Sequence, residues 1–194
     1  MMKPCKYDYS KFRDMDIFLS HSDKIIGRII KLATLMKFCP KDESIPTHGG
    51  FIVETYGQFF AAEMKPRYTE SSLKEYTGHF EQIVEIWRCK RFDDENVRIN
   101  ARKHLAYLHR EQKNYDATGA ILSSRLGQII FGRIPFFKNN KEGHFCTEMS
   151  SDVIRAYADP DMPIAPNPLD QSRYFKSRPD LYYPIEGFKL YHDI

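Results

Sequence analysis

Cys146 stands at the start of a segment with helical periodicity, and this position would activate its thiol. Met149, Val153 and Tyr157 recur at four-residue spacing and predict one buried face of a helix over residues 147–157. The N-terminus of a helix carries a partial positive charge, which stabilises a thiolate and lowers the pKa of a cysteine placed there. Backbone amides at the same place can bind the oxyanion of a tetrahedral intermediate. Cys146 is therefore the candidate nucleophile.

A histidine and a glutamate are predicted to meet across a β-hairpin in the first half of the chain. Residues 48–54 and 58–64 are rich in β-forming types and flank a turn that contains Gly57. With two to four residues in the turn, Glu63 falls opposite His48 or one step diagonal to it. A carboxylate there would fix the imidazole tautomer and stabilise its charged form.

These residues form a candidate triad for acyl transfer. Cys146 would attack a carbonyl carbon, His48 would take the thiol proton, and Glu63 would orient the imidazole. Glu54 ends the same strand as His48 and is the competing partner, but it lies at the far end of that strand. The separation of Cys146 from His48 in sequence means that only the fold can bring the two together.

The other cysteines give no sign of a metal centre or a disulfide framework. Cys5, Cys39 and Cys89 are widely spaced with no CxxC pair, so we interpret them as reduced structural thiols in a cytosolic setting. His144 and Cys146 are the nearest approach to a zinc-ligand pair, and we expect neither a metal nor another cofactor.

Several further segments have clear periodicity and predict the elements that must position the triad. Residues 15–19 and 82–89 predict strands, and residues 93–112 predict a helix with Val97, Ala101, Leu105 and Leu108 as its buried stripe. Helices are also expected around residues 25–36 and from residue 115 to about 126. The tail holds six prolines and is expected to be mostly extended, closing with a strand over 182–191.

Composition excludes several classes of protein. The chain has 194 residues, 42% of them hydrophobic, and this length and composition suit one domain over residues 1–194. Its formal charge is +3. No window is apolar enough for a membrane-spanning helix, and no signal-peptide block is present, so a cytoplasmic location is expected. The basic cluster at 88–91 is interpreted as a solvated strand exit rather than a nucleic-acid site.

Four stretches together resemble one known superfamily. They are MDIFL at 15–19, the helix at 25–35, THGGFIV at 47–53 and FCTEM at 145–149. In this order they resemble the circularly permuted, YiiX-like branch of the NlpC/P60 papain-like superfamily, in which the histidine hairpin precedes the cysteine. The resemblance covers about residues 14–185, with Gly49 standing where the family often has a small aliphatic residue.

The resemblance implies a fold and an activity. The fold would be an α+β papain-like domain whose central antiparallel sheet packs against the cysteine-bearing helix, and Cys146, His48 and Glu63 match the three catalytic positions. The activity would be that of a cysteine amidase or peptidase on short peptides such as cell-wall fragments. Two alternatives stay open: a lipid-directed acyltransferase or thioesterase with a chain groove formed by residues 131–137, and a non-catalytic binding or structural protein associated with a virus or phage.

Overall fold

The computed structural model describes residues 3–22, 45–65, 67–78, 80–111, 114–115, 143–144, 146–164 and 166–191. At residues 114–115, 143–144 and 146 only the backbone is described. Four features considered in the sequence lie wholly or almost wholly outside these ranges: the predicted helices at 25–36 and 115–126, the apolar segment at 131–137, and Cys39.

A six-stranded antiparallel sheet forms the centre of the molecule, in the order β5-β4-β3-β2-β6-β9. Its strands are β2 (Asp16–Ser22), β3 (His48–Thr55), β4 (Gln58–Met64), β5 (Tyr68–Ser72), β6 (Glu81–Cys89) and β9 (Tyr182–Pro184). Every residue of β2 is buried, as expected for a strand with neighbours on both sides. The predicted strands at 15–19 and 82–89 are confirmed as β2 and β6, whereas β5 was not anticipated.

The predicted hairpin is confirmed and joins β3 to β4 through two residues. Tyr56 and Gly57 both have positive φ angles, 51° and 73°, which is the signature of a type I′ turn. Thr55 then pairs with Gln58, and the register continues without interruption to Gly50 opposite Glu63. The turn therefore fixes which residues face one another at the far end of the hairpin.

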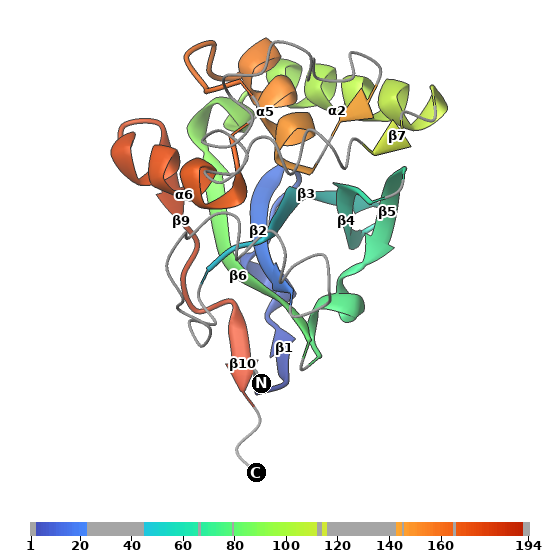
Figure 1. Ribbon diagram of the computed structural model, residues 1–194, viewed down its shortest axis with the longest axis vertical. Coiled ribbons are helices and arrows are strands. Elements are labelled where there is room, and N and C mark those ends of the chain that lie inside the picture. Colours follow the sequence, from blue (N-terminus) through green and yellow to red (C-terminus); the bar gives the residue numbers. More distant parts are fainter. Residues whose placement is uncertain are drawn as a thin grey trace, which may run out of the picture.

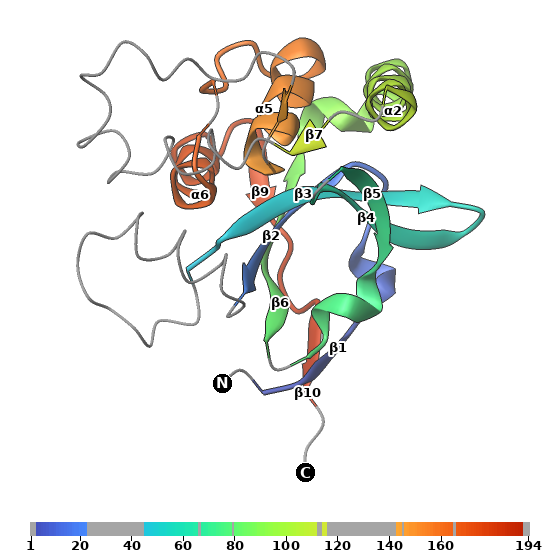
Figure 2. The same ribbon diagram turned by 45° about the vertical axis from the view of Figure 1, so that its right-hand side comes forward.

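Three helices pack around one face of the sheet (Figures 1 and 2). They are α2 (Glu95–Arg110), α5 (Cys146–Tyr157) and α6 (Pro168–Ser177). The larger hydrophobic cluster lies between them and the sheet, with Leu19 and Phe51 from the strands and Leu105, Met149 and Val153 from the helices. The helix predicted at 93–112 is confirmed as α2.

The other face of the sheet is covered by the two ends of the chain. β1 (Cys5–Tyr7) pairs with β10 (Lys189–Tyr191), and both lie with the N- and C-termini at the end of the molecule remote from α2 and α5 (Figure 1). A second hydrophobic cluster joins these segments, through Phe12 and Phe188, to Phe18 and Ile52 of the sheet. The remaining elements are η1 (Tyr9–Lys11), η2 (Leu73–Tyr76), η3 (Lys90–Asp93), β7 (Asn114–Tyr115) and β8 (Gly143–His144).

The expectation of a mostly extended tail was wrong. α6 lies within it, because Asn167 accepts a hydrogen bond from the backbone N–H of Asp170 and Pro168 occupies the first turn, where a missing N–H costs nothing. The single strand expected at 182–191 is instead the two short strands β9 and β10, which belong to different sheets. Gly187, with φ 66°, lies between them.

No helix in the described ranges is long and apolar enough to cross a membrane.

Candidate active site

His48 and Glu63 are in direct contact. His48 Nε2 lies 2.6 Å from Glu63 Oε2. Glu63 pairs with Gly50 in the hairpin, so it lies one step diagonal to His48 on the same face of the sheet, as the predicted register allows. The Glu63 side chain is completely buried, and that of His48 is 14% exposed. An ionised carboxylate in this position accepts a hydrogen bond from Nε2–H and thereby selects one imidazole tautomer.

Two residues that the sequence did not single out also contact the Glu63 carboxylate. The hydroxyl of Tyr76, at the end of η2, donates a short hydrogen bond to Oε2. Lys65, just after β4, places its Nζ 3.0 Å from Oε1 and 3.3 Å from Glu75 Oε2. Lys65 follows Glu63 by two residues, so the strand period places it on the same face, whereas no local pattern marks Tyr76 as a partner.

These contacts keep the carboxylate ionised. Burial by itself raises the pKa of Glu63. The neighbouring groups outweigh burial and lower the pKa to about 2, through the hydrogen bond and charge of His48, the charge of Lys65 and the hydrogen bond of Tyr76. Burial and the Glu63 charge raise the pKa of Tyr76 well above its usual value, so its hydroxyl keeps the proton that it donates. Near neutral pH the site thus holds a buried negative charge beside the imidazole.

α5 begins near the end of β3 that carries His48. A Cβ added to Gly49 would lie 3.3 Å from Thr147 Cγ2 and 2.9 Å from Leu19 Cδ2, so the absence of a side chain at Gly49 lets the first turn of α5 approach the strand closely. The Thr147 hydroxyl donates to the Pro166 carbonyl oxygen at 2.5 Å, which ties this turn to the segment before α6.

The imidazole and α5 approach the sheet from opposite faces. His48 shares its face with Phe18, whose ring centroid lies 6.3 Å from the imidazole, whereas Thr147 contacts Gly49 from the helix-covered face. His48 is the first residue of β3, and α5 begins at Cys146, so both stand at one end of the strand. The Cys146 side chain lies outside the described part of the structure, and its role stays a prediction.

Glu54 does not take the place of Glu63. It is exposed at the opposite end of β3, and its backbone N–H donates to Asp14 Oδ1. Ser20 of β2 pairs directly with His48, and its buried hydroxyl has no hydrogen-bond partner among the described residues. Ser20 is therefore a further polar group beside the imidazole that the sequence did not indicate.

The remaining residues considered from the sequence have structural surroundings. Cys5 and Cys89 are buried, and burial raises the pKa of each thiol, to about 11 for Cys89. The interpretation of residues 88–91 as a solvated strand exit was wrong for Arg88, which binds buried Asp16 through Nε at 2.7 Å and Nη2 at 2.8 Å. Its guanidinium is thus committed to an internal ion pair rather than to an external anion.

Comparisons with known proteins support the fold. No family model matches the sequence, and no curated protein matches it. Among solved structures, the chain is similar to the crystal structure of metalloprotein yiiX from Escherichia coli O157:H7, DUF1105. The TM-score is 0.52 at 14% sequence identity, and the match covers 94% of this chain and 90% of the other. The chain therefore has an α+β, YiiX-like fold with a mostly antiparallel sheet.

Proposed function

We propose that this protein is a cysteine hydrolase that cleaves an amide or ester bond through an acyl-thioenzyme. Cys146 would be the nucleophile, His48 the general base and Glu63 the residue that orients the imidazole. The observation that carries the proposal is the 2.6 Å contact between His48 Nε2 and the buried Glu63 carboxylate, at the end of the strand beside which α5 begins. A buried anion on an imidazole is costly to maintain and is typical of catalytic sites.

In this proposal each step of the reaction has a named atom. Because Nε2 donates to Glu63, Nδ1 is the nitrogen that takes the thiol proton of Cys146. The thiolate then attacks the carbonyl carbon, and backbone N–H groups at the start of α5 stabilise the oxyanion. The imidazolium gives its proton to the leaving amine or alcohol, and water, deprotonated by His48, hydrolyses the thioester.

The substrate class follows from the superfamily resemblance rather than from the described residues. That resemblance favours short peptides such as cell-wall fragments. The lipid-directed alternative depends on residues 131–137, which lie outside the described ranges. The contact of His48 with an ionised, buried carboxylate supports the hydrolase over a non-catalytic binding role.

The word metalloprotein belongs to yiiX and is not carried over to this chain. A protein metal site commonly takes at least three His, Cys, Asp or Glu ligands. The described residues contain no group of three such side chains that could hold a metal ion. The proposed steps use only side chains and backbone groups of the chain itself.

Alkylation with iodoacetamide tests whether Cys146 is activated. We expect Cys146 to react at least tenfold faster near neutral pH than Cys5 or Cys89, whose buried thiols have raised pKa values. His48→Ala should bring the rate for Cys146 down to that of an ordinary thiol. Peptide mapping by mass spectrometry at several times gives the rate for each cysteine. Equal rates in the wild type and in His48→Ala would refute the proposed pair.

Turnover on a panel of substrates tests the reaction class. The panel should contain short peptide amides, acyl esters and phospholipids, each assayed with the wild type and with Cys146→Ala. Hydrolysis of peptide amides that is lost in Cys146→Ala would support the amidase, and release or transfer of fatty acyl groups would favour the lipid-directed enzyme instead. Activity retained in Cys146→Ala would exclude the mechanism.

A further inference from the structure

The Glu63 carboxylate is held by donors from three separate segments. His48 at the start of β3 and Tyr76 at the end of η2 both hydrogen-bond to Oε2. Lys65 after β4 forms an ion pair with Oε1 at 3.0 Å, and this oxygen has no hydrogen bond among the described residues. A carboxylate bound by a single donor can turn about its last side-chain torsion, which has broad, two-fold minima. Contacts on both oxygens remove that freedom. The orientation of the carboxylate is thus set by residues outside the predicted triad.

Tyr76 is itself fixed by its surroundings. Its side chain is completely buried, and its ring packs edge-on against Phe18 with centroids 5.4 Å apart. Its backbone carbonyl accepts a hydrogen bond from the hydroxyl of Tyr7. The Lys65 ammonium lies 5.2 Å from the centre of the Tyr76 ring, and Glu75 binds the same ammonium. The two donors to Glu63 therefore support each other through a cation–π contact.

We propose that Tyr76 and Lys65 are positioning residues, which lock the Glu63 carboxylate and through it hold the His48 imidazole in the Nε2–H tautomer. All four residues of this lock, His48, Glu63, Lys65 and Tyr76, belong to the part of the chain that the structure describes. Its catalytic consequence, an Nδ1 lone pair kept ready for a thiol proton, rests on the proposed function. Tyr76 and Lys65 touch neither thiol nor substrate in this proposal and act only through Glu63.

The tautomer can be measured without any turnover. Histidine labelled with ¹⁵N reports on each ring nitrogen by NMR, and the signals of His48 among the seven histidines are assigned from the His48→Gln variant. The measurement is made in a Cys146→Ala background, at a pH above the titration of His48, so that no thiol proton and no imidazolium contribute. We expect a single Nε2–H tautomer. Tyr76→Phe and Lys65→Met should each give a mixture of the two tautomers, and Lys65→Arg should restore the single form.

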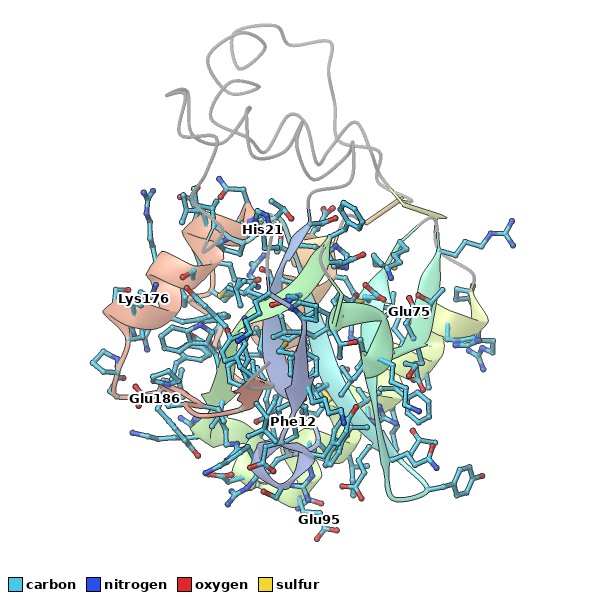
Figure 3. All side chains as sticks on the ribbon, turned by 90° about the horizontal axis from the view of Figure 1, so that it is seen from below. Phe12, His21, Glu75, Glu95, Lys176 and Glu186 are labelled. Carbon is cyan, nitrogen blue, oxygen red and sulfur yellow. The ribbon has the colours of Figure 1, made fainter. Side chains whose placement is uncertain are left out.

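Matched controls separate positioning from general loss of stability. Tyr182→Phe removes the buried hydroxyl of a tyrosine in the larger hydrophobic cluster, one that donates to the Asp159 carboxylate rather than to Glu63. Lys176→Met removes the ion pair between Lys176 and Glu85, which at 3.0 Å is as short as the pair between Lys65 and Glu63. Lys176 lies on the opposite side of the molecule from Glu75 (Figure 3). Neither control should change the His48 tautomer. If Tyr76→Phe and Lys65→Met also leave it unchanged, the proposal is overturned.

Kinetics then test the consequence for catalysis. With a substrate of the wild type in hand, Tyr76→Phe should lower kcat roughly 10- to 100-fold with little change in KM, since the groups that bind substrate are untouched. A rise in KM alone would contradict positioning. If the tautomer responds as expected but Cys146 is neither activated nor required for turnover, the lock stands and the hydrolase proposal fails. If Tyr76→Phe does not fold, Lys65→Met at its partly exposed position decides the question.

Discussion

At the scale of single residues, the buried carboxylates of Glu63 and Asp16 differ in the direction of their pKa shifts. Glu63 is surrounded by three donors that lower its pKa to about 2. Asp16 is buried beside one guanidinium, and there burial outweighs Arg88 and the neighbouring donors, so that its pKa is raised. Burial is the largest influence on both carboxylates, and only at Glu63 do the neighbouring charges and hydrogen bonds outweigh it. Each carboxylate supports a prediction that can be tested by substitution.

Glu63→Gln should slow turnover without abolishing it. The amide keeps the shape of the side chain but removes the charge that stabilises an imidazolium at His48, so we expect a fall in kcat of roughly 10²- to 10⁴-fold. Cys146→Ala should abolish turnover with little change in stability. Steady-state kinetics measures kcat of both variants against the wild type, and urea unfolding measures their stability. A Glu63→Gln enzyme with unchanged kcat would show that the carboxylate has no part in catalysis.

Arg88→Met should destabilise the protein by about 3 kcal/mol, because Asp16 is then left buried without its two-point partner. Urea unfolding measures the change. Arg173→Met is the control, since Arg173 and Asp170 form an exposed pair of a kind worth less than about 1 kcal/mol. Equal losses in the two variants would contradict the assignment of Arg88 to a structural ion pair.

At the scale of elements, the β3–β4 hairpin positions the site because its turn sets its register. Two residues with positive φ, Tyr56 and Gly57, close the hairpin, and every pair from Thr55 and Gln58 to Gly50 and Glu63 follows from that closure. A slip of one residue would turn the Glu63 side chain to the opposite face of the sheet. The turn is distant from His48 and yet determines whether the contact forms.

Tyr56→Asn should stabilise the hairpin by about 0.5–1 kcal/mol. Tyrosine adopts a positive φ only at a cost, asparagine adopts it more readily before glycine, and the fully exposed Tyr56 ring has no packing to lose. The midpoint of thermal unfolding should rise accordingly. Gly57→Ala, which adds strain in the same turn, should lower it. A lower midpoint for Tyr56→Asn would mean that the tyrosine ring has an unrecognised stabilising role.

At the scale of the whole molecule, the sheet divides the interior into two clusters, and His48 stands at the start of β3, a strand inside the sheet. His48 and Glu63 belong to the face shared with Phe18 and Tyr76, whereas α5 packs on the other face. Because Glu63 is charged and buried in the folded protein, its ionisation is coupled to the global stability of the fold.

This coupling predicts a defined loss of stability in acid. Glu63 has a lower pKa in the folded state than its ordinary value of 4.5, so its contribution is complete above about pH 4.5 and is lost as the pH falls toward about 2. Urea unfolding of the wild type and of Glu63→Gln across this range isolates the contribution. The stability advantage of the wild type should shrink steadily as the pH falls. Parallel curves would show that the folded-state pKa is not depressed.

The sequence by itself determined the local elements and one contact of the site. Two runs of β-forming residues and a glycine-containing turn predicted the hairpin and the range of its register. The approach of His48 and Glu63 followed, because strand pairing converts sequence spacing into distance. Helical periodicity predicted α2, and the same kind of periodicity predicted a helix starting beside Cys146. These are short-range consequences of residue type.

Only the tertiary structure decided what surrounds that contact. Tyr76 reaches Glu63 because η2 folds back over the sheet. The first turn of α5 approaches β3 because Gly49 has no side chain. Neither contact produces a periodic pattern in the sequence. α6 was missed because prolines around it suggested an extended chain, although Asn167 and Pro168 begin a helix. Such contacts depend on burial between segments distant in sequence, where packing and desolvation outweigh local propensity.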